Sequence, residues 1–257
     1  ANLTAYYEQN ADHLRTVFQF GEGVKEVRFS SAEHFCLSYP FVAYQYYYLQ
    51  EALKGLSSHN AFTGRHVSRG ERSMLEVFQD VGKQMADTPL VSFATFDRMF
   101  DGIRQTLQSG LLRQVDTAEQ YISNPLSIRL IKALLMLKYV NDFSATVEHL
   151  TTLMLESPDH DRAALKTSVQ EALDALEYQS YIQRSGEVYE YLTDREKDVE
   201  IEIKNTEVEY SEMRRTIGQV VVERTLKQPK LIFEDNDQPY GFSVFVDEEQ
   251  YRKGPSD

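Results

Sequence analysis

A cluster of positive charge opens one predicted helix of this otherwise acidic chain. Residues 64–75 contain Arg65, Arg69, Arg72 and His66 against a single acid, whereas the whole chain has a net charge of -13. Helix N-termini bind anions through unpaired backbone amides, and guanidinium groups add charge-assisted hydrogen bonds to phosphate. These residue types therefore predict a phosphate-binding corner. The alternative is a solvated basic patch that pairs with acids elsewhere on the surface.

The start of this helix can be located from its capping residues. Ser68 is followed three residues later by Glu71, which is the spacing of a capping box and predicts Arg69 at the first helical position. At about 100° per residue, Arg69 and Arg72 lie opposite the apolar face, so we expect both side chains to point away from the core. The apolar face consists of Met74, Phe78, Val81 and Met85.

The composition predicts a folded, soluble protein of the cytoplasm. Hydrophobic residues make up 42% of the 257 residues, which is enough to form a core. The sequence has no apolar run long enough for a membrane span and no signal peptide, and its single cysteine, Cys36, excludes a disulfide framework. Because the chain begins with Ala1 and ends on a loop-like Gly-Pro-Ser-Asp sequence, we expect a piece of a longer protein.

The acidity is concentrated in the second half of the chain. Residues 1–124 hold 14 acids and 11 bases, whereas residues 125–257 hold 26 acids and 16 bases. Proteins bind nucleic acid largely by neutralising phosphates with Lys and Arg, so this charge disfavours DNA contact by the second half.

Residues 1–124 are predicted to form an all-helical domain. The domain ends at Asn124, a capping residue, followed by Pro125, which suits the first turn of a new helix. Its helices are predicted over residues 1–20, after Tyr39-Pro40 as far as Gly55, in the arginine-bearing segment, and over 96–107 and 111–122.

Aromatic residues are dense between positions 41 and 48. Rings at this density could form a base-stacking platform, but such platforms carry interleaved Lys and Arg, and the next base here is Lys54. The aromatic residues are therefore predicted to pack in the core.

Residues 125–193 have the element order of a winged helix. Apolar patterns predict three helices, over 126–140, 147–155 and 161–179. Alternating strands then flank Ser185-Gly186, a two-residue hairpin signal. Three helices followed directly by a hairpin predict a winged-helix domain.

The third helix of this domain lacks the composition of a DNA-reading helix. A DNA-reading third helix enters the major groove and carries basic or amide side chains at its start. Here Arg162 and Lys166 are outnumbered by acids, and the hairpin offers only Arg184 among charged neighbours of the opposite sign. A structural or protein-docking role is predicted ahead of DNA recognition.

Residues 194–257 are predicted to contain a long amphipathic helix and a short β segment. A helix of some 30 residues would extend roughly 45 Å and would carry apolar residues in heptad steps. The tail, 230–233 and 242–246 around a turn-rich stretch, predicts a hairpin or two edge strands. The heptad residues are Val199, Ile203, Thr206, Tyr210, Met213, Ile217 and Val220.

The chain lacks the motifs of several catalytic sites. No Gly-x-x-x-x-Gly-Lys-Ser/Thr loop and no His-Glu-x-x-His occurs in the sequence. Asp159, His160 and Asp161 would bind a metal only if further acids converged on them, so they are predicted to place favourable charge at a helix start. We therefore expect no catalytic residue, no metal and no ATP hydrolysis by this chain alone.

Four segments, in order along most of the chain, resemble the large P-loop ATPase of BREX phage-defence systems, the BrxC/PglY family. The segments are 39–45 (YPFVAYQ), 66–75 (HVSRGERSML), 130–140 (LIKALLMLKYV) and 187–193 (EVYEYLT). The resemblance implies an internal fragment of an AAA+ ATPase, downstream of its nucleotide-binding core, with a helical lid followed by a winged helix.

The resemblance also implies a function for the arginines. In such ATPases a lid helix presents an arginine to the bound phosphates, which carries over to Arg69 or Arg72, with Arg65 and His66 as weaker candidates. ATP and Mg²⁺ would belong to the parent protein. The implied partners are the rest of the ATPase core, other BREX proteins and a homo-oligomer, in bacterial or archaeal cytoplasm. A DNA-binding module and a protein-interaction scaffold are the alternative functions.

Overall fold

The structure is a computed structural model that describes residues 2–63, 70–206, 209–227, 230–233 and 237–252. Contacts divide the chain into two compact units, Ala1–Ile201 and Glu202–Asp257. Helices predominate and the strands are few and short, so the predicted mainly helical class is confirmed.

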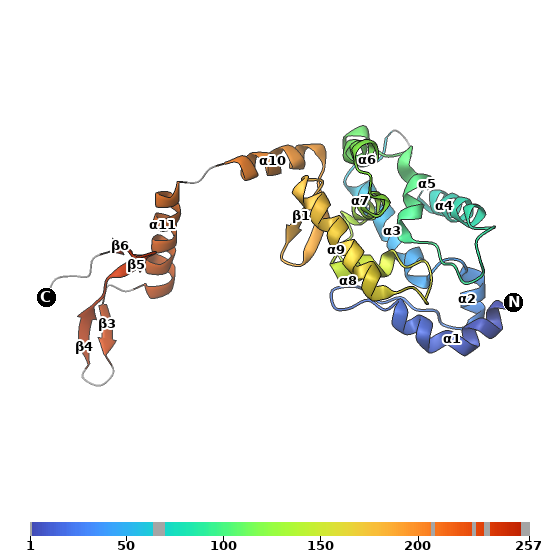
Figure 1. The fold of residues 1–257 in the computed structure, drawn as a ribbon, viewed down its shortest axis with the longest axis horizontal. Helices are drawn as coiled ribbons and strands as arrows, with labels where there is room; N and C mark the ends of the chain where they lie inside the picture. The colour runs from blue at the N-terminus through green and yellow to red at the C-terminus, as the bar shows by residue number, and fades with distance from the viewer. Residues whose placement is uncertain (1, 64–69, 207–208, 228–229, 234–236, 253–257) are drawn as a thin grey trace. The chain divides into compact units, whose positions relative to one another are not determined.

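Within its described residues, the first unit consists of helices apart from one β hairpin (Figure 1). The elements are α1 (Leu3–Val17), α2 (Ala32–Ser38), α3 (Ala43–Ser58), α4 (Gly70–Gln84), the 3-10 helix η2 (Phe96–Met99), α5 (Phe100–Arg104), α6 (Ser109–Tyr121), α7 (Pro125–Leu137), α8 (Val147–Leu153), α9 (Arg162–Tyr178), β1 (Ile182–Ser185), β2 (Val188–Tyr191) and α10 (Asp194–Asn205), which runs across the unit boundary.

Helix α7 lies at the centre of the first unit. Most of its residues are buried, and α3, α5, α6, α9, η2 and β2 all pack against it. The buried apolar residues form one cluster that extends from Leu14 in α1 to Tyr191 in β2. The boundary we expect between Asn124 and Pro125 falls inside this unit, where Asn124 Oδ1 accepts from Leu126 N (3.0 Å) and caps α7.

Residues 125–193 contain the predicted helices and hairpin. Asp161 caps α9 by accepting from Ala164 N (3.0 Å), which places its charge at the helix start as expected. Strands β1 and β2 pair antiparallel from Ile182 opposite Tyr191 to Ser185 opposite Val188. The turn between them has Gly186 at φ 62°, a conformation that glycine adopts without strain.

The aromatic segment packs in the core, and one glycine has a different role from the predicted one. Tyr44 and Tyr48 are completely buried, which confirms core packing.

Gly55 does not end the helix, because α3 continues to Ser58. A Cβ at Gly55 would lie 2.6 Å from the Tyr139 carbonyl oxygen, so the glycine allows close approach of the two backbones. The sequence reading also missed α2, which Ser31 caps through a bond from His34 N.

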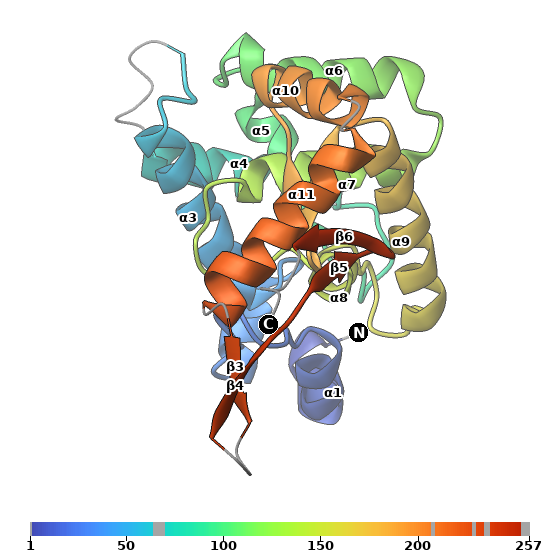
Figure 2. The same ribbon diagram turned by 90° about the vertical axis from the view of Figure 1, so that its left-hand side faces the viewer.

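The second unit contains a helix, a π-helical segment and two hairpins (Figure 2). Strands β3 and β4 form one antiparallel pair, and β5 and β6 form another. The elements are α11 (Tyr210–Gln219), the π-helical η3 (Val220–Leu226), β3 (Lys230–Phe233), β4 (Gln238–Gly241), β5 (Val244–Val246) and β6 (Glu249–Arg252).

Two expectations for residues 194–257 are wrong. The long helix is not continuous, since α10 ends at Asn205 and Thr206 and Glu209 lie outside any helix. Helix α10 buries none of its side chains, so no packing stabilises a continuation of the helix past Asn205. The predicted strands at 230–233 and within 242–246 are present as β3 and β5, but they do not pair with each other: β3 pairs with 238–241, which we expected to be the turn, and β5 pairs with β6.

Candidate functional site

The side chains of the predicted nucleotide-sensing arginines are not among those that the structure describes. Ser68, Arg65, His66 and Arg69 lie outside the described residues, and the side chain of Arg72, whose backbone belongs to α4, does too. The phosphate-binding corner therefore stays a prediction.

The structure does describe how α4 is anchored. Phe78 stacks on Tyr46 with ring centroids 4.4 Å apart and meets the edge of Phe41 at 4.8 Å. On α5, a Cβ at Gly102 would lie 2.7 Å from Val77, so the two helices are in close contact. The predicted apolar face is confirmed, since Phe78, Val81 and Met85 are buried and Met74 is half-buried.

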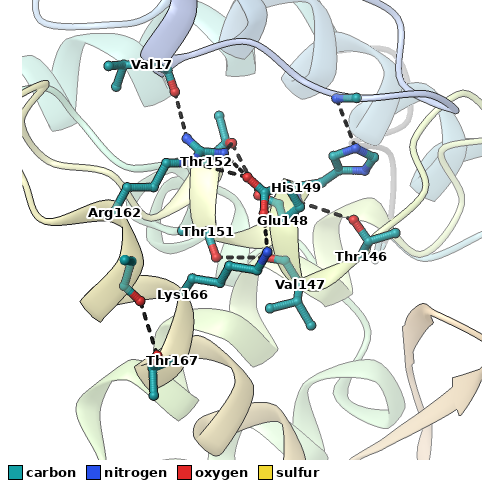
Figure 3. A network of polar contacts seen from close by, with 12 residues as sticks. Val17, Thr146, Val147, Glu148, His149, Thr151, Thr152, Arg162, Lys166 and Thr167 are labelled. Atoms are coloured by element: carbon teal, nitrogen blue, oxygen red, sulfur yellow. Dashed lines mark hydrogen bonds and ion pairs between the residues drawn. The ribbon is translucent and has the colours of Figure 1, made fainter.

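Both bases at the start of α9 contact Glu148, which lies on the first turn of α8 (Figure 3). Its Oε1 accepts from Arg162 Nη2 and its Oε2 pairs with Lys166 Nζ, both at 2.7 Å. The hydrogen bonds from Lys166 and Arg162 hold the pKa of the Glu148 carboxyl below its ordinary value. Glu148 thus stays ionised and engages both bases of α9.

Arg162 also ties α9 to the first helix of the chain. Its Nη1 donates to the carbonyl of Val17 and its Nη2 to Thr152 Oγ1, both at 2.8 Å. One guanidinium therefore joins the end of α1, the end of α8 and the start of α9. Arg162 therefore has a structural role, holding these three helices together.

His149 forms a second link beside this junction. It is almost completely buried, and its Nε2 accepts from Gly21 N at 3.1 Å. Because an amide nitrogen can only donate, Nδ1 carries the hydrogen and donates to the Ser144 carbonyl. Both ring nitrogens are occupied, so His149 supports the loop after α1.

The β1–β2 hairpin uses its single base internally. Arg184 Nε donates to the Gly186 carbonyl at 2.8 Å, and the guanidinium lies 5.5 Å from the ring centroid of Tyr189. Gln183 donates to Glu190 across the strands, and Glu187 is exposed. Neither the hairpin nor the start of α9 presents an uncompensated cluster of bases within the described residues.

A second ion network, which sequence reasoning missed, joins α5, α6 and α7. Arg104 donates to both carboxylate oxygens of Glu119, and Lys132 Nζ lies 3.0 Å from Glu119 and 3.2 Å from Asp101. Arg104 holds the pKa of Glu119 low, against an opposing effect of burial, with help from Lys132. No spacing in the sequence signals this network, since its members come from three helices.

One recess of about 200 Å³ lies between α1 and residues 26–29. Its lining combines apolar side chains with charged residues of both signs, so it favours neither anions nor cations. The charged lining residues are Asp12, Arg15, Glu26 and Arg28.

Metal-ligating side chains do not gather in the part of the chain that the structure describes. Asp159 lies 3.9 Å from His13, and Asp161 is used as a helix cap.

Cys36 is a free, half-buried thiol whose sulfur lies 3.4 Å from Thr4 Oγ1. Among the described residues, no helix has the length and apolar character to cross a bilayer.

Comparison with known proteins adds no assignment. No protein-family model matches this chain, and no solved structure matches it.

Proposed function

We propose that this chain is the lid-like and winged-helix segment of a BREX-type phage-defence P-loop ATPase. In this proposal an arginine near position 70 senses the nucleotide bound by the parent protein, and residues 125–193 dock against protein. Three features support it: the four resembling segments, the helix order with its β1–β2 hairpin, and the use of the α9 bases within the fold.

Continuous packing supports coupling between the arginine helix and the winged helix. Helix α4 packs on η2 and α5, both of these pack on α7, and α7 packs on α9 and β2. A shift of α4 on release of a phosphate contact would reach the proposed winged helix through packed side chains. Such an order change on nucleotide hydrolysis is a familiar switching device.

The observation that carries the docking role is the engagement of Arg162 and Lys166 by Glu148. A DNA-reading helix needs its bases free to meet phosphates and base edges. Farther along α9, Glu171 and Asp174 are exposed and would repel a duplex. Protein is therefore the favoured partner of this surface, and DNA is the alternative.

Nucleotide sensing is tested in the full-length ATPase with Arg69→Ala and Arg72→Ala. Loss of the sensing arginine should lower ATP turnover by on the order of a hundredfold, as for other preorganised donors at a developing charge. Lys83→Ala is the matched control, because Lys83 is on the same helix and pairs with an exposed partner, Asp80. Unchanged affinity and turnover in both arginine variants would refute the sensing role.

Docking is tested against the DNA alternative by titrating the chain with duplex DNA at several salt concentrations. We expect weak binding with little salt dependence, because phosphate contacts would make affinity fall steeply with salt. Glu148→Gln sharpens the test by releasing Arg162 and Lys166, and it should increase DNA affinity. Tight, salt-sensitive binding by the unaltered chain would favour the DNA-binding module.

A further inference from the structure

The second unit carries an uncovered apolar column on α11 and the start of η3. Met213, Ile217 and Val220 follow each other at steps of four and three residues, which places them on one helix face. They are 46%, 45% and 43% exposed. Side chains of these types are normally buried, and three aligned on one face form a contiguous surface.

The neighbouring side of α11 is already occupied. A Cβ at Gly218 would lie 2.3 Å from the ring of Tyr251, so β6 lies directly against the helix here (Figure 2). Arg214 pairs with Glu249 of β6, and its guanidinium lies 4.8 Å from the ring centroid of Tyr210. The β5–β6 hairpin therefore covers the Arg214–Gly218 side and leaves the apolar column open.

The other border of the column is acidic. The helical positions next to it, on the side away from the hairpin, are Glu212, Thr216 and Gln219, and Glu209 is the N-cap residue just before them; all four are exposed. Gln219 Nε2 donates to Glu223 Oε2 at 3.1 Å, which brings a third carboxylate to this border. Arg215 is on the opposite side of α11, since it lies about 170° from the column at 100° per residue.

We propose that this column docks an amphipathic helix of another polypeptide whose apolar face is bordered by Lys or Arg. Apolar side chains would fill the Met213–Ile217–Val220 face, and the basic border would meet Glu209, Glu212 and Glu223. This is the helix-in-groove mode of recognition, with charge complementarity setting partner choice and orientation. The proposal stands independently of nucleotide sensing.

A second copy of the chain does not fit this surface. In an antiparallel pair of such helices the acidic borders would face each other, which is repulsive. In a parallel pair the acidic border would have to meet the other side of the column, and the β5–β6 hairpin covers that side. The charge and the hairpin together favour a different, basic partner.

The test titrates the full chain with two synthetic helical peptides that differ only in charge. Both have Leu at heptad positions a and d, and one has Lys and the other Glu at positions e and g. Fluorescence anisotropy should show binding of the Lys peptide and roughly tenfold or more weaker binding of the Glu peptide.

Three variants locate the binding on the column. Ile217→Lys should weaken binding of the Lys peptide by roughly tenfold or more, as loss of an interface anchor does. Glu212→Lys should weaken it by about threefold to tenfold and reduce its salt dependence. Glu187→Lys is the matched control, because this exposed acid lies in the first unit and should leave binding unchanged.

Ile217 is exposed, so the variant is expected to fold, and an unchanged circular dichroism spectrum checks this. Equal binding of the two peptides, or full binding by Ile217→Lys, would overturn the proposal. So would sedimentation that shows a dimer of the unaltered chain which Ile217→Lys dissociates, because the occupant would then be a second copy.

Discussion

The two units of this protein carry similar apolar patterns but bury them very differently. In Ala1–Ile201 the patterned residues merge into one buried cluster around α7. Among the described residues of Glu202–Asp257, only Gly218 and Val244 are buried. In that unit Ile232 and Phe245 are 65% and 59% exposed.

The difference teaches that periodicity shows which face of a helix is apolar but not what covers it. In the first unit α3, α5, α6, α9, η2 and β2 all pack on α7 and bury most of its residues. In the second unit the described elements that pack on α11 are η3, β5 and β6, and they leave one face of the helix exposed. The apolar face of α11 is therefore interpreted as contact surface, and the apolar residues of α4 and α7 as core.

The sharpest test of this comparison truncates one isoleucine in each unit. Ile131 in α7 is completely buried, and Ile217 in α11 is 45% exposed. Ile131→Ala should lower the free energy of unfolding by about 2–5 kcal/mol, because transfer and cavity terms add. Ile217→Ala should change it by less than about 0.5 kcal/mol. Urea unfolding followed by circular dichroism measures both, and equal losses would show that the column of α11 is buried.

A glycine in each unit provides the second test. Gly55→Ala would press a methyl group against the Tyr139 carbonyl and should cost about 1–3 kcal/mol despite the better helix propensity of alanine. Gly218→Ala would displace the ring of Tyr251, so its effect should be confined to the hairpin. Gly82→Ala is the control, since no described atom would lie within 4 Å of the added Cβ, and it should stabilise the fold by up to about 1 kcal/mol.

Amide chemical shifts separate the two glycine outcomes. Gly218→Ala should move the signals of residues 244–252 and leave those of α7 unchanged. A global loss of stability in Gly218→Ala, as large as in Gly55→Ala, would show that the two units share one core.

Much of the first unit could be predicted from the sequence because its local signals agree with its packing. Asn124 and Asp161 mark helix starts through their capping side chains, and Gly186 marks the hairpin turn. The apolar face of α4 also follows from spacing alone. Each of these features depends on residues within one or two turns of each other.

Contacts between distant segments could not be predicted in the same way. Gly55 looks like a helix stop, yet its neighbour is Tyr139, far along the chain. The partners of Arg104 and Glu148 come from other helices, so no spacing identifies them. No proline or glycine marks the break after α10, so the sequence does not signal it. Helix α10 buries none of its side chains, and a helix without packing is seldom long.

The smallest expected change in the free energy of unfolding comes from replacing one arginine-bound glutamate in each unit. Glu119 is 28% exposed and bonded to Arg104 and Lys132, whereas Glu249 is 71% exposed and paired with Arg214. Glu119→Gln should cost about 1 kcal/mol near neutral pH, because it weakens charge-assisted bonds to two bases. Glu249→Gln should cost less than about 0.5 kcal/mol, as is usual for an exposed pair.

The pH dependence separates the Glu119 pairing from simple packing. The pKa of Glu119 is lower in the folded state than its ordinary 4.5, so the folded state binds its proton less readily than the unfolded state. Its stabilising contribution is therefore complete above about pH 5 and is lost as the pH falls below 4.5 and through the lowered pKa. Unfolding free energies measured from pH 7 to pH 3 should show the unaltered chain and Glu119→Gln converging at the acidic end. A difference that stays constant over this range would mean that Glu119 contributes through packing, and that the ion network does not stabilise the first unit.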